Sequence, residues 1–156
     1  MAQRFQTLLV WAACCQVADT SLQLALTPRR FPRLAPFSRR DLARLRNTLI
    51  AFVHSVLMFG GALPYMLPLF RPSFPFVEIP SVSPNSAVEV FYIELMLGYL
   101  IYDLVACWRQ GDGVLILAHH ILGMASHFPM RLFNVGGSYL MWVHFAEARA
   151  TRTRAQ

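Results

Sequence analysis

Several side chains that can transfer protons lie inside stretches of almost purely apolar sequence. The clearest case is LAHHILG, residues 117–123, where two histidines follow each other between aliphatic residues. Ionisable groups are costly inside a membrane, so each one is a candidate functional residue. A carboxylate beside an imidazole fixes the ring tautomer, and this pairing suits proton transfer or imidazole attack on an acyl thioester. The candidates for such chemistry are His54, Asp103, His119, His120, His144 and Glu147.

Five apolar runs have to position these side chains. The runs cover residues 5–26, 48–70, 87–107, 113–130 and 132–148. A helix needs about 20 residues to cross the hydrocarbon core of a bilayer. The chain is 56% hydrophobic and 14% charged, whereas a typical soluble domain has about 25% charged residues. The sequence therefore predicts an all-α, multi-pass transmembrane helical bundle of about five spans, the first of them a retained anchor helix or, alternatively, a signal-like segment.

The basic residues indicate how this bundle is oriented. All 14 are arginine, and seven of them lie in the loop TPRRFPRLAPFSRRDLARLRN, residues 27–47. Cytoplasmic loops carry an excess of basic residues, so we expect this loop to be cytoplasmic. Five alternating spans then place Arg109 and the arginines of the tail on the same side. Because the arginines lie between apolar runs and not along one face of a soluble unit, nucleic acid is not expected as a partner.

Depth and helical periodicity bring several candidates together. A helix rises about 1.5 Å per residue, so residues equally far from the cytoplasmic ends of their runs lie at one level. These residues are His54, Asp103, His119, His120 and His144. One stripe of run 87–107 comprises Tyr92, Leu95, Met96, Tyr99 and Asp103, and one stripe of run 113–130 comprises His120, Gly123, Met124 and His127.

Two other features refine this layer. Adjacent His119 and His120 diverge by about 100° on a helix, so one of them can act while the other orients it or pairs with Asp103. Glu94 lies on the opposite side of its helix from Asp103 and is predicted to form an interhelical hydrogen bond. Gly123, Gly136 and Gly137 are expected to allow close approach of helix backbones.

Plainer interpretations stand beside the catalytic one. A buried histidine in a helical bundle is often a hydrogen-bonded packing residue. Metal binding by the adjacent histidines is disfavoured, because they point apart and no H-x-x-x-H spacing exists. Cys14, Cys15 and Cys107 lack regular spacing and are interpreted as small buried hydrophobes. We expect no metal site and no cofactor.

The order of these segments resembles a known membrane-protein family. LRNTLIAFVHSVL, ELMLGYLIYDLV, LAHHILG and an apolar run ending in FAEA together resemble the TLC domain, which is shared by ceramide synthases, translocating-chain-associating proteins and the smaller TLC domain-containing proteins. The short loop WRQGDGVLILAHH is most similar to the small members. The resemblance covers residues 46–148, which are expected to form a partial TLC domain. Hydropathy and charge predict an N-terminal anchor helix and basic cytoplasmic loop at 1–45 and a short basic tail at 149–156.

The resemblance also implies roles for individual residues. In ceramide synthases a histidine pair is needed to transfer an acyl group from acyl-CoA to a sphingoid base, and that pair falls by position on His119 and His120. Family members usually continue after the position of Glu147 with an STPF-like stretch and further spans, so ARATRTRAQ is expected to be a truncated or alternative end. Residues expected to contact lipid or substrate are His54, Tyr99, Tyr102, Asp103, His144 and Glu147.

By this resemblance the function is membrane lipid homeostasis, meaning lipid sensing, transport or control of composition. The expected location is the endoplasmic reticulum, with the plasma membrane or Golgi as alternatives, and the expected partners are membrane lipids and a homo- or hetero-oligomer. Whether the chain is an enzyme stays open. One alternative is an acyl-CoA-dependent N-acyltransferase of ceramide-synthase type, with acyl-CoA as its substrate. Another is a membrane trafficking or chaperone adaptor whose arginine loop binds partners.

Overall fold

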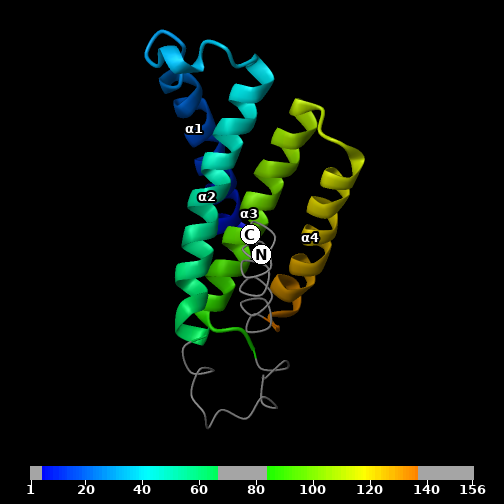
Figure 1. Ribbon diagram of the computed structural model, residues 1–156. Coiled ribbons are helices and arrows are strands. Elements are labelled where there is room, and N and C mark those ends of the chain that lie inside the picture. Colours follow the sequence, from blue (N-terminus) through cyan, green and yellow to red (C-terminus); the bar gives the residue numbers. More distant parts are fainter. Residues whose placement is uncertain (1–4, 67–83, 137–156) are drawn as a thin grey trace.

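The chain forms a bundle of four helices in the computed structural model, which describes residues 5–66 and 84–136. The elements in order are α1 (Gln6–Ala25), the short 3-10 helix η2 (Pro32–Leu34), α2 (Arg39–Met66), α3 (Ala87–Gln110) and α4 (Val114–Phe133). The α1–α2 connection and the α3–α4 turn lie at the same end of the bundle (Figure 1). Within the described residues the regular structure is helical, apart from one isolated bridge pair, so the predicted all-α class is confirmed.

Three of the helices are long and apolar enough to cross a membrane. They are α1, the Arg39–Gly61 part of α2, and α3. Helix α4 has 20 residues, but its three histidines and one arginine lower its hydropathy, and it is not among them. Most of the predicted fifth run, 132–148, lies outside the described residues. The count of five spans therefore stays a prediction.

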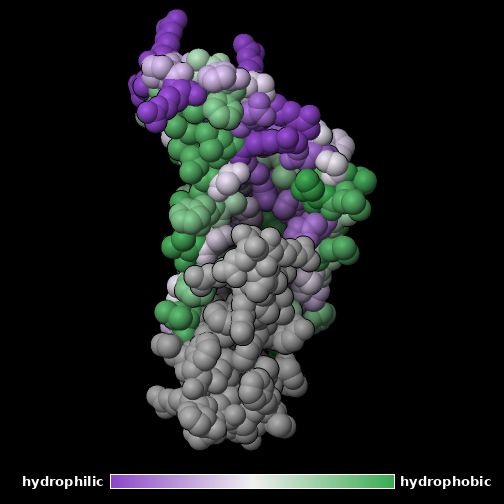
Figure 2. All heavy atoms as spheres, viewed as in Figure 1, coloured by the Kyte–Doolittle hydropathy of each residue, from purple (hydrophilic) through white to green (hydrophobic). Residues whose placement is uncertain are grey.

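The surface of the bundle is apolar along its length and polar at one end. Among the described residues, more large hydrophobic side chains are exposed than buried, including Leu9, Phe52 and Leu115. Hydrophilic residues gather at the end that holds the two connections (Figure 2). A water-soluble bundle buries its apolar stripe, so this inverted distribution is the one expected of helices surrounded by lipid.

Local capping sets the helix boundaries. Ser38 and Asp41 exchange side-chain and backbone hydrogen bonds at the start of α2, and Ser86 forms a capping box with Glu89 at the start of α3. Such reciprocal hydrogen bonds pair backbone N–H groups that have no partner within the first turn of a helix. The arginine-rich segment was predicted to be a loop up to Asn47, and this is wrong for its second half, because the Ser38 cap starts α2 at Arg39.

Helix α3 lies at the centre of the described bundle and packs against the other three helices. Gly98 allows α1 to approach, since a Cβ added there would lie 2.5 Å from the carbonyl oxygen of Leu8. Leu8, Ile93 and Leu97 form one buried apolar cluster at this contact. The close approach expected at Gly123 is milder, because its neighbour there is the side chain of Leu100.

Candidate functional site

A buried carboxylate on α3 gathers side chains from three helices. Asn47 Nδ2 of α2 donates to Asp103 Oδ1 over 2.6 Å, and Tyr99 OH donates to Asp103 Oδ2 over 3.0 Å. His120 Nε2 of α4 lies 3.2 Å from the same Oδ2. Asp103 is 6% exposed and His120 is 8% exposed. We call Asp103, His120, Asn47, Tyr99 and Cys107 the Asp103 centre.

Helix geometry explains why these side chains meet. Tyr99, Asp103 and Cys107 are spaced by four residues, so they lie along one face of α3. Cys107 Sγ lies 3.7 Å from Asp103 Oδ1 and 3.7 Å from His120 Nε2. Helix α4 presents His120 and His127 as its buried residues, which are the two ends of the stripe predicted from its periodicity. Asn47 reaches the centre because α2 is already helical at that position.

A second histidine lies beside the Asp103 centre. The ring of His54 stacks on that of Tyr99 with centroids 4.1 Å apart, and its Nε2 lies 3.3 Å from Met96 Sδ. The indole of Trp11, on α1, lies 6.4 Å from the His54 ring. A chain of aromatic contacts therefore joins α1 to the buried carboxylate.

The structure brings four of the predicted site residues together and separates others. His54, Tyr99, Asp103 and His120 form one connected set, whereas His119 is exposed and its ring is 5.6 Å from that of His120. The expected divergence of the two histidines is thus present. Tyr102 lies beside this set, with its ring 6.4 Å from that of Tyr99, but it forms a buried cluster with Cys15 and Ile50. His144 and Glu147 lie outside the described residues.

Two residues of the Asp103 centre, Asn47 and Cys107, were not predicted as site residues from the sequence. Cys107 was interpreted only as a small hydrophobe, yet its sulfur contacts both Asp103 and His120. Its position four residues after Asp103 was the available signal. Asn47 was placed at the end of a loop, so no helical face could be assigned to it until the start of α2 was known.

Ion pairs tie the helices together on either side of the centre. Arg131 Nε donates to Glu94 Oε1, which confirms the interhelical bond predicted for Glu94. Arg46 Nε donates to Asp19 Oδ1 over 2.9 Å and joins α2 to α1. At the polar end, Arg44 Nη2 donates to Asp112 Oδ1 over 2.8 Å. That guanidinium lowers the pKa of the Asp112 carboxyl from its ordinary value of 3.8.

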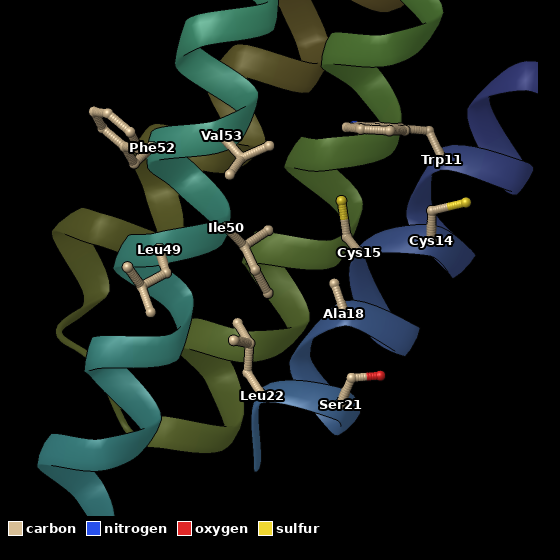
Figure 3. A pocket seen from close by; sticks show the side chains of 10 residues that line it. All are labelled: Trp11, Cys14, Cys15, Ala18, Ser21, Leu22, Leu49, Ile50, Phe52 and Val53. Atoms are coloured by element: carbon tan, nitrogen blue, oxygen red, sulfur yellow. The ribbon is translucent and has the colours of Figure 1, made fainter. Parts of the chain in front are cut away.

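An apolar groove runs between α1 and α2. Its volume is about 630 Å³, which falls within the range of about 300–1,000 Å³ typical of small-molecule sites. Cys15 of α1 and Ile50 of α2 line it from opposite sides, and α3 lies behind (Figure 3). The lining residues are Trp11, Cys14, Cys15, Ala18, Ser21, Leu22, Leu49, Ile50, Phe52 and Val53. We call this feature the α1–α2 groove.

The two features differ in the chemistry they can support. The Asp103 centre offers an imidazole oriented by a carboxylate, and His120 Nδ1 is buried with no hydrogen-bond partner among the described residues. The α1–α2 groove offers hydrocarbon-like walls with a single hydroxyl, that of Ser21. Trp11 lines the groove and also contacts the ring of His54, so it lies between the two features.

No protein-family model matches the chain, and no solved structure matches it.

Proposed function

We propose that this chain is a multi-pass membrane protein of TLC type that binds a lipid acyl chain in the α1–α2 groove and acts in membrane lipid homeostasis. The observation that carries the proposal is the groove itself. Its walls are aliphatic and aromatic side chains and two thiols, and its volume of about 630 Å³ suits one flexible chain. Both helices that form it are long and apolar enough to cross a membrane.

The charge at one end of the groove supports a lipid with an anionic headgroup. Ser21 and Leu22 lie in the last turns of α1, which ends at Ala25 and leads into the arginine-rich connection. Each basic residue near an anionic leaflet contributes about 1 kcal/mol of attraction. The exposed arginines of residues 27–47 are Arg29, Arg30, Arg33, Arg39, Arg40 and Arg44. The acyl chain then runs from that end toward Trp11.

The resemblance to the TLC domain supports the endoplasmic reticulum as the membrane in which this lipid binding takes place. Binding one lipid chain suits a sensor or carrier of lipid composition, and it needs no chemical step. The adaptor alternative gains less support, because Arg40, Arg44 and Arg46 of the basic segment form contacts within the chain.

Photo-crosslinking tests the proposal. The full chain is reconstituted in liposomes that contain an anionic phospholipid with a photoreactive acyl chain, and the crosslinked peptides are identified by mass spectrometry. We expect crosslinks to concentrate on the groove residues of α1 and α2. Ala18→Phe fills the groove and should remove most of them. Ala125→Phe makes the same change at an exposed alanine of α4 and should leave them in place.

Two results would overturn the assignment. Crosslinks spread evenly over all exposed apolar faces, with no loss in Ala18→Phe, would leave the groove without a lipid. Crosslinks from one copy of the chain to another through the groove would assign it to a second copy instead.

A second candidate function is supported by the His120–Asp103 pair. A carboxylate 3.2 Å from Nε2 orients the ring, and the buried Nδ1 is then an acceptor that can take a proton from an attacking amine. In an N-acyltransferase the amine nitrogen would attack the thioester carbonyl of acyl-CoA, and coenzyme A would leave as the thiol. Labelled acyl-CoA and a sphingoid base test this: product lost in His120→Ala and retained in His119→Ala supports it, and absence of product in the wild type opposes it.

A further inference from the structure

Three potential metal ligands of different types meet in the Asp103 centre. A carboxylate oxygen of Asp103, the sulfur of Cys107 and Nε2 of His120 all lie within 4.8 Å of one another, and all three residues are buried. Two of them come from α3 and one from α4. They are held in place by helix packing and not by a loop, which gives the set a fixed shape before any ion binds.

The distances from His120 Nε2 to the other two ligands are close to the edges of a metal tetrahedron. Ligand bonds of about 2.0 Å for oxygen and nitrogen and 2.3 Å for sulfur give edges of about 3.3 Å between oxygen and nitrogen and about 3.5 Å to sulfur. The observed separation is 3.2 Å between Asp103 Oδ2 and His120 Nε2. Cys107 Sγ lies 3.7 Å from His120 Nε2 and 3.7 Å from the other carboxylate oxygen of Asp103, Oδ1. One oxygen of Asp103, Sγ and Nε2 all lie within 4.8 Å of one another.

Hydrogen bonding alone accounts for these contacts less completely. The thiol has one proton and Nε2 of the imidazole has one, so two protons serve three close contacts, and the third contact is left without one. A single ion bound to one carboxylate oxygen of Asp103, to Cys107 Sγ and to His120 Nε2 would explain why all three side chains converge. Beside it, Asn47 Oδ1 is a buried acceptor with no donor among the described residues, and a water on the metal would be such a donor.

The charge of the set also favours a dication. Cys107 loses its proton when it ligates a metal, so the ligand set then carries the two negative charges of a carboxylate and a thiolate. A divalent ion with these two ligands and a neutral imidazole forms a neutral unit. Tyr99 and Asn47 donate hydrogen bonds to the Asp103 carboxylate, as supporting groups around metal ligands do.

We propose that Asp103, Cys107 and His120 bind one zinc ion. Oxygen, nitrogen and sulfur ligands at tetrahedral spacing are typical of Zn²⁺. Three protein ligands leave a fourth position for water or a substrate atom, as in catalytic zinc sites. The site goes beyond the lipid-binding proposal and does not depend on it, because none of its ligands lines the α1–α2 groove.

Metal titration of the purified full chain tests this site. The chain is extracted in detergent, treated with a chelator and titrated with Co²⁺ alone, which replaces zinc and gives a thiolate-to-cobalt charge-transfer band together with visible bands of tetrahedral cobalt. We expect about one ion per chain, displaced by Zn²⁺. Cys107→Ser should lose the charge-transfer band, and His120→Gln should lose stoichiometric binding.

Neighbouring residues supply matched controls. Cys14→Ser removes an exposed cysteine and His119→Gln an exposed histidine one position from the ligand, and both variants should keep the band and the stoichiometry. Tyr99→Phe removes a supporting hydrogen bond and should weaken binding by about 10–100-fold.

The wild-type chain gives a second readout that needs no folded variant. Zinc returned to the chelator-treated protein should raise its thermal midpoint, because a ligand that binds only the folded state stabilises it. Absence of a cobalt band and of any zinc-dependent shift in the wild type would overturn the proposal. An unchanged band in Cys107→Ser, or its loss in Cys14→Ser, would overturn the assignment of the ligands.

Discussion

The contact between α1 and α3 depends on a glycine, and this gives a sharp test of the fold. A Cβ at position 98 would lie 2.5 Å from the carbonyl oxygen of Leu8 and 3.2 Å from the backbone nitrogen of Ala12. The shortfall from the 3.4 Å at which ordinary contact begins is about 0.9 Å. Both neighbours are backbone atoms and cannot rotate away, so Gly98→Ala forces the two helices apart.

The expected cost is at the upper end of the range for overpacking, about 3 kcal/mol. For a chain of this size that corresponds to a fall of roughly 6–12 °C in the thermal midpoint. The assay is thermal unfolding of the purified chain in detergent, followed by circular dichroism. Since α1 forms one wall of the α1–α2 groove, Gly98→Ala should also reduce photo-crosslinking of lipid to that groove.

Two other glycines serve as controls for this substitution. Gly60 has no atom within 4 Å of the added Cβ, so Gly60→Ala should be neutral or raise stability by about 0.5–1 kcal/mol. Gly123 faces the flexible end of Leu100 at 3.2 Å, and Gly123→Ala should change the midpoint little. Equal midpoints for Gly98→Ala and Gly60→Ala would refute the α1–α3 contact described above.

Two further predictions concern the charged groups. Arg131→Gln leaves Glu94 without its guanidinium partner and should destabilise the chain by about 3 kcal/mol. The double variant Glu94→Gln, Arg131→Gln should recover most of that loss. Equal thermal midpoints of the single and double variants would contradict the pairing. Arg44 lowers the pKa of the Asp112 carboxyl below 3.8. The ion pair between Arg44 and Asp112 should therefore stabilise the folded chain at neutral pH, and this stabilisation should be lost as the pH falls through the lowered pKa. In Asp112→Asn the thermal midpoint should lack this loss when it is measured as the pH is lowered past 3.8. The same dependence of the midpoint on pH in the wild type and in Asp112→Asn would contradict the role of the ion pair.

Periodicity and hydropathy predicted much of the helical framework. The apolar runs 5–26 and 87–107 correspond closely to α1 and α3, because each is apolar over most of its length and ends at a local cap or turn. The stripe containing Tyr99 and Asp103 and the stripe containing His120 do face each other. In both cases the information is local, since a helical face follows from spacing alone.

The remaining features depend on how the helices pack, and spacing alone could not supply them. The α1–α2 groove arises from the separation of two helices, which no run of residues specifies. Tyr102 is adjacent to Asp103 in sequence, but the helical turn directs it toward Cys15 and Ile50. Cys107 became a candidate ligand only when α4 brought His120 next to it. The early start of α2 came from the side-chain cap at Ser38, within a segment that was interpreted by its charge.

The central claim is that these helices lie in a bilayer with their polar groups gathered inside and at one end, and accessibility of spin labels in liposomes tests it most directly. A nitroxide is attached at Val17→Cys, on an exposed position of α1, or at Arg33→Cys, in the connection to α2. The Cys14→Ser background removes the exposed native thiol. If the helices lie in a bilayer, the label at position 17 should collide often with oxygen and rarely with a water-soluble nickel chelate, and the label at position 33 should show the reverse. Ready access of the nickel chelate to the label at position 17 would contradict the central claim.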